Sequence, residues 1–350
     1  MKVAVLGATG TVGQRIVKML DGHPMFELAE VAASERSEGK KYEEAMKGRW
    51  KLEGGMPKYA RDLVVRPCVP ELESRLVFSA LDAAVAGPIE EEFAKAGHAV
   101  SSNARNHRMD PDVPLVIPEV NFGHVKAVEK QMKRMGGSGY IVTDPNCSTI
   151  GMTLALKPLH DRYGIDRVRV VTMQAISGAG YPGVPSMDIL GNVIPYISGE
   201  EAKMQTEIKK ILGSYTEEDG FRYADMGVSA QCNRVPVEDG HMECLFISFK
   251  NKPANAGEVA KALESYEGFH PDLELPTAVQ WPIVVLGDDD RPQPRLDRYK
   301  GNGMAVTVGR VREDPLGDYA MAILSHNTIR GAAGAALLNA EALLAYKYLD

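Results

Sequence analysis

One cysteine in this chain of 350 residues stands where a nucleophile would be useful. Cys147 follows the turn signal Asp144-Pro-Asn and begins a segment with helical character. A helix N-terminus offers unpaired N–H groups and a partial positive charge, which favour a thiolate. We therefore predict that the pKa of Cys147 is lowered and that its sulfur is the nucleophile. Cys68, Cys232 and Cys244 lie on or beside apolar runs, where cysteine is typically a small core residue.

A thiolate nucleophile needs a group that manages its proton, and histidine is the usual choice. His241 follows a turn at Gly240 and begins a strand, so it can point into a cleft. Spacing alone does not select it, although the other histidines are more typical of surface or capping positions: His23, His98, His107, His124, His160, His270 and His326.

A metal site is the alternative use of these residues, because Cys232, His241 and Cys244 lie close in sequence. The chain has no C-x-x-C pair, and residues three apart on a strand face opposite sides of a sheet. The sequence therefore predicts no bound metal.

A glycine-rich turn after the first apolar run points to a dinucleotide. Leu6-Gly-Ala-Thr-Gly-Thr-Val-Gly13 is a G-x-x-G-x-x-G variant of the fingerprint that joins a strand to a helix. Glycine allows the tight turn, the approach of a pyrophosphate and close helix–strand packing, and the helix N-terminus favours the phosphate charge. The predicted cofactor residues of this turn are Gly7, Thr9, Gly10, Thr11, Val12 and Gly13.

The second predicted strand is 28–33, and the segment that follows it indicates which dinucleotide binds. An NAD site usually has an acidic residue there for the ribose 2′-hydroxyl. This chain instead has hydroxyl and cationic side chains that can hold a 2′-phosphate. The alternative is a solvated loop of mixed charge that binds no cofactor, and the acidic Glu35 in the segment keeps that alternative open. We predict NADP, with contacts from Ser34, Arg36, Ser37 and Lys40.

The elements that position these residues change in kind near Cys147. The first 145 residues alternate strands and helices, which predicts an α/β fold with a doubly wound, Rossmann-like parallel sheet. Its predicted strands are 2–6, 28–33, 63–66, 76–80, 98–101, 113–117 and 140–143. Its predicted helices are 11–21, 87–96 and 123–134.

The remainder of the chain predicts an α+β part with a mainly antiparallel or mixed sheet, because helices are fewer per strand. A helix is expected from Cys147 to about Tyr163, bent or ended early by Pro158. The further strands are 167–176, 228–235, 241–250, 279–286, 304–312 and 319–325, and the further helices are 186–195, 199–213 and 254–265. An apolar helix at 327–348 is expected to pack back on the first part.

We therefore predict two domains: a cofactor domain at 1–146, completed by the C-terminal helix 327–350, and a catalytic and dimerisation domain at 147–326. The composition is 44% hydrophobic and 25% charged, which is typical of a soluble globular protein. A net charge of −7 without a basic run disfavours nucleic acid and anionic membranes as partners. The short apolar N-terminus breaks at Gly7, so we expect a cytoplasmic protein.

The motifs together resemble aspartate-semialdehyde dehydrogenase of the archaeal and fungal branch, over essentially the whole chain. The stretches that carry the resemblance are Gly7–Gly13, Ser102–Arg108, Asp144–Ser148, Ser177–Gly183, Arg234–His241, Arg291–Asp297 and Ser325–Gly331. The resemblance implies an NADP-dependent enzyme that reduces L-4-aspartyl phosphate to L-aspartate 4-semialdehyde through a cysteine thioester. That reaction serves the biosynthesis of lysine, threonine, methionine and isoleucine, and the family is typically dimeric or tetrameric.

The resemblance also implies roles for individual residues. Cys147 would be the nucleophile, His241 the acid and base that shuttles the proton, and Gln174 the residue that orients substrate and water. Arg234 has the fork of donors that suits the substrate carboxylate. Glu201 would bind the ammonium group, although the adjacent Glu200 leaves that assignment open by one position. Phosphate would meet Lys203, Asn103 and Arg105, and the cofactor would also meet Ser79, Ser177, Gly178 and Asn327.

Three alternatives stay open at this stage. Malonyl-CoA reductase uses the same thioester chemistry but needs no amine-binding carboxylate and no acyl-phosphate site. N-acetyl-glutamyl-phosphate reductase acts on a longer, acylated substrate that would not want Glu201. A non-catalytic NADP-binding regulator would tolerate the loss of Cys147, His241 or Arg234, and all three residues are present.

Overall fold

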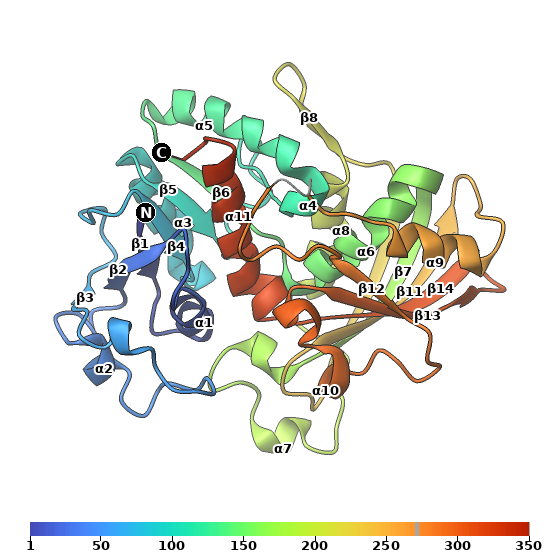
Figure 1. Ribbon diagram of the computed structural model, residues 1–350, viewed down its shortest axis with the longest axis horizontal. Coiled ribbons are helices and arrows are strands. Elements are labelled where there is room, and N and C mark those ends of the chain that lie inside the picture. The colour runs from blue at the N-terminus through green and yellow to red at the C-terminus, as the bar shows by residue number, and fades with distance from the viewer. Residues whose placement is uncertain (270–272, 350) are drawn as a thin grey trace.

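The computed structural model describes residues 1–269 and 273–349 and contains two six-stranded sheets side by side (Figure 1). The strands of the first sheet all run parallel in the order β3-β2-β1-β4-β5-β6. They are β1 (Lys2–Leu6), β2 (Glu27–Ala32), β3 (Val65–Arg66), β4 (Leu76–Ser79), β5 (Ala99–Ser102) and β6 (Tyr140–Thr143). Because β1 has β2 on one side and β4 on the other, the chain leaves its carboxyl end at a switch point, where α/β sheets bind ligands. The predicted doubly wound sheet is confirmed.

The second sheet is mixed, as predicted, with the order β10-β7-β11-β14-β13-β12. Its two outer pairs, β10 with β7 and β12 with β13, are parallel, and the inner pairs are antiparallel. The strands are β7 (Ile165–Gln174), β10 (Gly227–Arg234), β11 (His241–Phe249), β12 (Ile283–Leu286), β13 (Val306–Glu313) and β14 (Tyr319–Ser325). A short hairpin, β8 (Ser214–Thr216) and β9 (Gly220–Arg222), stands apart from both sheets.

The helices cover the sheets and join them. The helices of the first 146 residues are α1 (Thr11–Met19), α2 (Tyr42–Ala45), α3 (Ala83–Lys95), α4 (Pro118–Asn121) and α5 (Ala127–Met135). The later ones are α6 (Cys147–Tyr163), α7 (Ser186–Ile189), α8 (Glu200–Ile211), α9 (Ala256–Glu264), α10 (Pro294–Asp297) and α11 (Gly334–Ala345).

Helix α11 lies between the two sheets and is buried almost throughout (Figure 1). Ala336 and Leu337 pack into the core beneath the first sheet, whereas Ala335 belongs to the core of the second. The predicted return of the C-terminal helix to the first sheet is confirmed, and its expected last residue, Asp350, lies outside the described residues.

Four predicted elements are absent or shorter than expected, and two of them are the strands predicted at 63–66 and 279–286, which are reduced to β3 and β12. The run 113–117 is no strand, because Pro114 has no N–H to donate and contributes only a carbonyl that accepts from Thr143. A single bridge between Leu115 and Thr143 remains. The helix expected at 186–195 ends at Ile189, and Gly191 then takes a positive φ of 69°. Pro158, in contrast, is tolerated inside α6.

The C-terminal helix begins with a π-helical turn, Ile329–Ala333, instead of an α-helical one. Isolated π turns are frequent at functional sites. Here the turn brings Gly331 so close to Cys147 that a Cβ at Gly331 would lie 2.8 Å from the cysteine Cβ.

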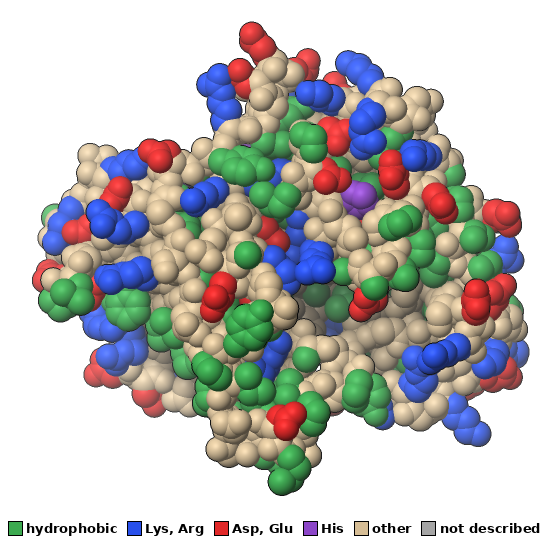
Figure 2. Space-filling view, turned by 180° about the vertical axis from the view of Figure 1, so that it is seen from behind, with side chains coloured by type: hydrophobic (Ala, Val, Ile, Leu, Met, Phe, Trp, Pro, Cys, Tyr) green, Lys and Arg blue, Asp and Glu red, His purple; other side chains and the backbone are tan. Residues whose placement is uncertain are grey.

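The surface mixes charges of both signs. Figure 2 shows lysine and arginine side chains interspersed with acidic ones, and a basic group within a hollow near the middle of that face. Within residues 1–269 and 273–349, every helix is too short or too polar to cross a lipid bilayer.

Candidate active site

The first turn of α6 is built around Asn146. Its side-chain Oδ1 accepts the N–H groups of Ser148 at 3.1 Å and Thr149 at 3.3 Å. An asparagine in this capping position satisfies N–H groups that would otherwise lack a partner. Because β6 ends at Thr143 and the turn is short, Cys147 becomes the first residue of the helix, as predicted.

Tertiary structure brings His241 to this cysteine. His241 is the first residue of β11 and is fully buried, and its Nε2 lies 3.2 Å from Cys147 Sγ. Its other ring nitrogen, Nδ1, accepts the backbone N–H of Ala175 at 3.1 Å. Gln174, the last residue of β7, is buried next to Ala175. The structure thus brings Cys147 of α6 and His241 of β11 into contact, and the side chain of Gln174, at the end of β7, reaches Glu200 beside them.

The predicted lowering of the cysteine pKa is wrong. Burial raises the pKa of Cys147 to about 12, and the Glu200 carboxylate raises it further, against the opposing charges of Lys203, Arg108 and Arg234. Burial also lowers the pKa of His241 to about 3, aided by Arg234. Both shifts favour the neutral thiol and the neutral imidazole.

A carboxylate at the start of α8 faces this pair, and it belongs to Glu200. Glu200 Oε2 accepts from Asn146 Nδ2 at 2.8 Å and from Gln174 Nε2 at 3.5 Å, and Oε1 pairs with Lys203 Nζ at 2.5 Å. Glu201 points elsewhere, because its Oε1 accepts the backbone N–H of Cys232 at 3.1 Å. Neighbouring side chains on an α-helix point about 100° apart. Glu200 therefore points toward Asn146 and Gln174, whereas Glu201 lies against β10.

Two further charged residues of α8 were missed by the sequence reasoning. Glu207 Oε2 accepts the backbone N–H of Asn146 at 2.7 Å, and its Oε1 binds Arg108 at 3.0 Å. The ammonium group of Lys210 donates to the backbone carbonyls of Arg108, Asp110 and Val113 at 2.8–2.9 Å.

The signal for these residues was present in the sequence. Glu200, Lys203, Glu207 and Lys210 follow the helical spacing of three, four and three, which places all four on one face. Such a charged stripe normally faces water. In this chain it faces inward and ties α8 to the cysteine turn and to the segment that carries Asn103 and Arg105.

The remaining predicted substrate residues lie around the same site. Arg234, at the end of β10, is 6% exposed and donates one Nη1 bond to the Ala175 carbonyl at 2.7 Å. Arg105 is exposed and lies near Gly199, next to Lys203. The amide of Asn103, in the orientation that satisfies its surroundings, donates to Asp144 Oδ2 at 2.8 Å and Ala332 O at 3.3 Å.

The glycine turn has the shape that a pyrophosphate requires. Gly7 has φ +72°, and a Cβ there would lie 2.6 Å from the carbonyl of Ala80. A Cβ at Gly13 would lie 2.3 Å from the carbonyl of Gly7, so only glycine permits this helix–strand contact. Gly10, which precedes α1, is exposed. The turn thus forms an open cradle in front of the helix N-terminus, with Thr9, Thr11 and Val12 half-buried beside it, which fits a dinucleotide.

The residues predicted for the 2′-phosphate are only partly available. Ser34, Arg36 and Lys40 are exposed directly after β2, whereas Ser37 is 2% exposed. Ser79, at the end of β4, is fully buried, and its hydroxyl donates to Glu90 at 2.5 Å. Burial therefore removes the Ser37 and Ser79 hydroxyls from the groups that can contact a cofactor.

Two predicted cofactor residues from distant segments meet at the other end of the site. Asn327 Nδ2 donates to Ser177 Oγ at 2.8 Å, and Asn327 Oδ1 accepts the N–H of Gly240 at 2.8 Å. Gly178 is packed so closely that a Cβ there would lie 2.9 Å from Arg234 Nη1.

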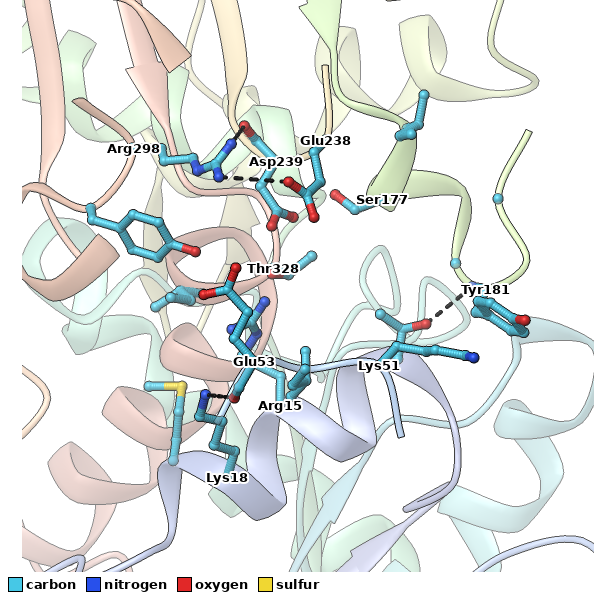
Figure 3. Close-up of a pocket in the computed structure, with 18 of the residues that line it drawn as sticks. Arg15, Lys18, Lys51, Glu53, Ser177, Tyr181, Glu238, Asp239, Arg298 and Thr328 are labelled. Atoms are coloured by element: carbon cyan, nitrogen blue, oxygen red, sulfur yellow. Dashed lines mark hydrogen bonds and ion pairs between the residues drawn. The ribbon is translucent and has the colours of Figure 1, made fainter. Parts of the chain in front are cut away.

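A cavity of about 660 Å³ lies between α1 and this segment (Figure 3). Thr11 and Ser177 border it together with Arg15, Lys18 and Asp239. The Thr11 hydroxyl also accepts the backbone N–H of Tyr181 at 3.1 Å. Cys147 and His241 are not part of its lining, so the cavity marks the cofactor side of the site and not the nucleophile itself.

The other candidate ligands are dispersed. Of the remaining histidines, His23 pairs with Glu341 and His107 with Asp110, while His98, His124 and His326 are buried, and His270 lies outside the described residues. In the part of the chain that the structure describes, no three histidine, cysteine or acidic side chains gather as a metal site.

Comparison with known families agrees with this geometry. Residues 2–128 match the family model described as "Semialdehyde dehydrogenase, NAD binding domain", and residues 156–330 match "Semialdehyde dehydrogenase, dimerisation domain". The chain therefore belongs to the semialdehyde dehydrogenase family.

Full-length relatives are more specific. The aspartate-semialdehyde dehydrogenase of Candida albicans is 51% identical, with 98% of each chain covered, and that of Archaeoglobus fulgidus is 49% identical over 99% of each. A crystal structure of the Candida albicans enzyme with NADP superposes with a TM-score of 0.91 at 49% identity, covering 99% of both chains. The resemblance to the archaeal and fungal branch, stated from the motifs, is confirmed.

The raised pKa of Cys147 has a measurable consequence. In the ligand-free protein the rate of Cys147 alkylation by iodoacetamide should rise about tenfold per pH unit from pH 6 to 10, because the thiolate fraction does so below the pKa. Cys147, Cys68 and Cys244 are all half-buried, so peptide mass spectrometry is needed to follow Cys147 separately, with Cys147→Ser as the blank. A rate that levels off below pH 8 would show instead that the thiol is already ionised there.

Proposed function

We propose that this protein is an NADP-dependent aspartate-semialdehyde dehydrogenase, which reduces L-4-aspartyl phosphate to L-aspartate 4-semialdehyde and releases phosphate. The observation that carries the proposal is the pairing of Cys147 Sγ with His241 Nε2 at 3.2 Å, directly beside the Glu200 carboxylate and Arg234. NADPH, when bound, supplies the hydride. The product feeds the synthesis of lysine, threonine, methionine and isoleucine.

Cys147 forms the covalent bond in this proposal. Its sulfur attacks the acyl carbon, phosphate leaves, and a thioester holds the acyl group until reduction releases the aldehyde. His241 faces the sulfur and the oxygen that becomes negatively charged, and Gln174 orients the acyl group beside Glu200. Cys147 is only half-buried, so its surroundings limit but do not abolish the access of water to the thioester.

Three charged groups match the substrate. Arg234 uses one donor on Ala175, so its other N–H groups remain to bind the α-carboxylate. We assign the ammonium group to Glu200 in place of Glu201, since Glu200 faces Cys147. Lys203 and Arg105 then lie on the side of Glu200 where the phosphoryl group carries its negative charge.

The cofactor assignment rests on the glycine cradle and its flanks. Gly10 leaves room for the pyrophosphate in front of α1, and Arg36 and Lys40 are the exposed cations after β2 that suit a 2′-phosphate. Ser177, Gly178 and Asn327 lie against the catalytic pair, which is where the nicotinamide must be. A relative solved with NADP supports this choice.

The Glu200 carboxylate separates this proposal from its alternatives. A malonyl-CoA reductase has no substrate ammonium group for a buried carboxylate to bind. A non-catalytic NADP-binding protein has no need of a cysteine and a histidine in contact at the end of the cofactor site.

We also propose how the chain is organised. Residues 1–146 with the C-terminal helix 327–350 form the cofactor domain, and 147–326 form the catalytic and dimerisation domain. All strands of the parallel sheet lie within the first range, which supports this division. The reaction and the four free thiols suit the cytoplasm.

The outer face of the second sheet supports a homo-oligomer. Residues on β7 alternate between buried and exposed, and on β11 between buried and half-buried. Val171 and Cys244 pair across the two strands, and Phe246 follows on the same face. The same face carries the exposed Arg167 and Arg169 of β7 beside this apolar group. We propose a dimer, or a tetramer of two dimers, through it.

The activity has a direct test. Purified protein should reduce NADP+ with aspartate semialdehyde only when phosphate is present, and should be inactive with malonate semialdehyde plus coenzyme A. Cys147→Ser should abolish turnover while the fluorescence of bound NADPH remains. Turnover by Cys147→Ser, or preference for the coenzyme A substrate, would reject the proposal.

The choice between neighbouring carboxylates has a matched pair of variants. Glu200→Gln should lower kcat/KM for aspartate semialdehyde about 10- to 100-fold, the equivalent of one lost hydrogen bond to a charged group. Glu201→Gln, whose carboxylate binds only backbone, should change kcat/KM far less. NADPH affinity and thermal unfolding serve as controls in both. A larger loss of kcat/KM in the Glu201 variant would show that Glu201, and not Glu200, binds the ammonium group.

The interface can be disrupted by charge. Val171→Lys should shift the protein to monomers in size-exclusion chromatography with light scattering, because it replaces an apolar contact by a further cation beside Arg169 and buries it in the interface. Val85→Lys places the same charge on exposed α3, outside the second sheet, and should leave the mass unchanged. An unchanged oligomer with Val171→Lys would place the interface elsewhere.

A further inference from the structure

The loop that carries Asn103 and Arg105 depends on groups outside it. Residues 103–113, which we call the phosphoryl loop, lie between β5 and α4 and form turns and bends. The hydrogen bond from the Arg108 N–H to the Arg105 carbonyl is 3.4 Å long, and a bond of this length restrains a chain only weakly. The loop therefore needs an anchor elsewhere in the fold.

Lys210, near the end of α8, provides such an anchor. It is 1% exposed, and its Nζ donates to the carbonyls of Arg108 and Val113 at 2.8 Å and of Asp110 at 2.9 Å. An ammonium group has three N–H donors, so the phosphoryl loop takes all of them. The ring centroid of Phe221 on β9 lies 4.3 Å from the same nitrogen, and an aromatic face stabilises a cation.

A second attachment of the phosphoryl loop comes from one turn earlier on α8. Glu207 binds Arg108 Nη1, and Arg108 Nη2 donates to the Asn103 carbonyl at 2.8 Å. Glu207 also accepts the N–H of Asn146, so replacing it would disturb the cysteine turn as well. The three Nζ bonds of Lys210 all go to the phosphoryl loop, so replacing Lys210 tests the loop separately.

Helix α8 joins this anchor to the substrate residues. Lys210 follows Glu200 by ten residues, which is about 15 Å along an α-helix, so Lys210 acts through the loop and not by touching the substrate. Glu200 and Lys203 lie in the first turns of the same helix. One rigid element therefore sets the position of the phosphoryl loop relative to the carboxylate that we assign to the ammonium group.

We propose that Lys210 is a positioning residue for phosphate, which holds Asn103 and Arg105 in place through the backbone of the phosphoryl loop. This inference rests on the proposed function and deepens its phosphate site. Groups that are ordered before binding lose less conformational freedom when the ligand arrives. Removal of the anchor should therefore weaken the binding of phosphate more than that of the other substrates.

Steady-state kinetics of NADP+ reduction can separate phosphate from the other ligands. Lys210→Met keeps the length of the side chain but removes its charge and its donors. KM for inorganic phosphate should rise about tenfold or more, the equivalent of a weakened charge-assisted hydrogen bond, while KM for aspartate semialdehyde and for NADP+ should each change less than about threefold. An unchanged KM for phosphate, or equal rises in all three KM values, would overturn the proposal.

Two further variants control for charge and folding. Lys209→Met removes the same charge from the neighbouring, half-buried position and should leave all three KM values unchanged. Lys210→Arg carries the test if Lys210→Met does not fold. It keeps the charge, but a planar guanidinium is less suited to three diverging carbonyls, so KM for phosphate should rise by a smaller factor and the other two should hold. Equal changes in all three would again overturn the proposal.

Hydrogen–deuterium exchange gives a readout that needs no substrate. In the ligand-free variants at position 210, amides of the phosphoryl loop should exchange faster than in the unaltered protein, while those of β1 and α1 should not. Unchanged exchange in the loop would overturn the anchor. An unaltered protein without phosphate-dependent turnover would reject the proposed function instead, so the two failures are distinguishable.

Discussion

The capping of α6 by Asn146 is the interaction on which the rest of the site depends. Its side-chain oxygen fixes the first turn of the helix, and its amide group donates to Glu200. Its backbone N–H is held by Glu207. One residue thus joins the turn that carries Cys147 to the helix that carries Glu200. Because each of these groups is buried, none can exchange its partner for water without a free-energy cost.

Burial sets the chemistry of this site more than the helix N-terminus does. Removing water from Cys147 and His241 favours their neutral forms, and the nearby Glu200 carboxylate adds to the effect at sulfur. A neutral thiol is a weak nucleophile until an electrophile is bound beside it. Fixed donors then act on charge as it develops, and they need no rearrangement to do so.

The two sheets divide the work of building the site. The parallel sheet presents the glycine turn and the start of α6 at its carboxyl edge. In the mixed sheet, β7 ends at Gln174, β10 ends at Arg234 and β11 begins at His241. The C-terminal segment connects them, since its π turn touches Cys147 at Gly331 while α11 packs against the first sheet. The position of the cysteine is therefore fixed from both sides.

Local sequence determined the features that depend on neighbours along the chain. The glycine cradle, the turn before Cys147, the alternation of strands and helices and the return of the apolar C-terminal helix follow from short-range backbone rules and apolar periodicity, and all are found. The combined motifs also identified the family. The apolar composition of residues 113–117 wrongly predicted a strand, because Pro114 within that run has no N–H for a ladder of hydrogen bonds.

Tertiary structure alone decided which side chains meet and in what charge state. Glu200 and Glu201 are equivalent in type, and only the rotation of α8 against α6 selects Glu200. The pKa of Cys147 depends on burial and on the charges around the sulfur, and the orientation of the His241 ring depends on a hydrogen bond from the backbone of Ala175. Hydration and contacts between distant segments are properties of packing, so no pattern within a short stretch of sequence contains them.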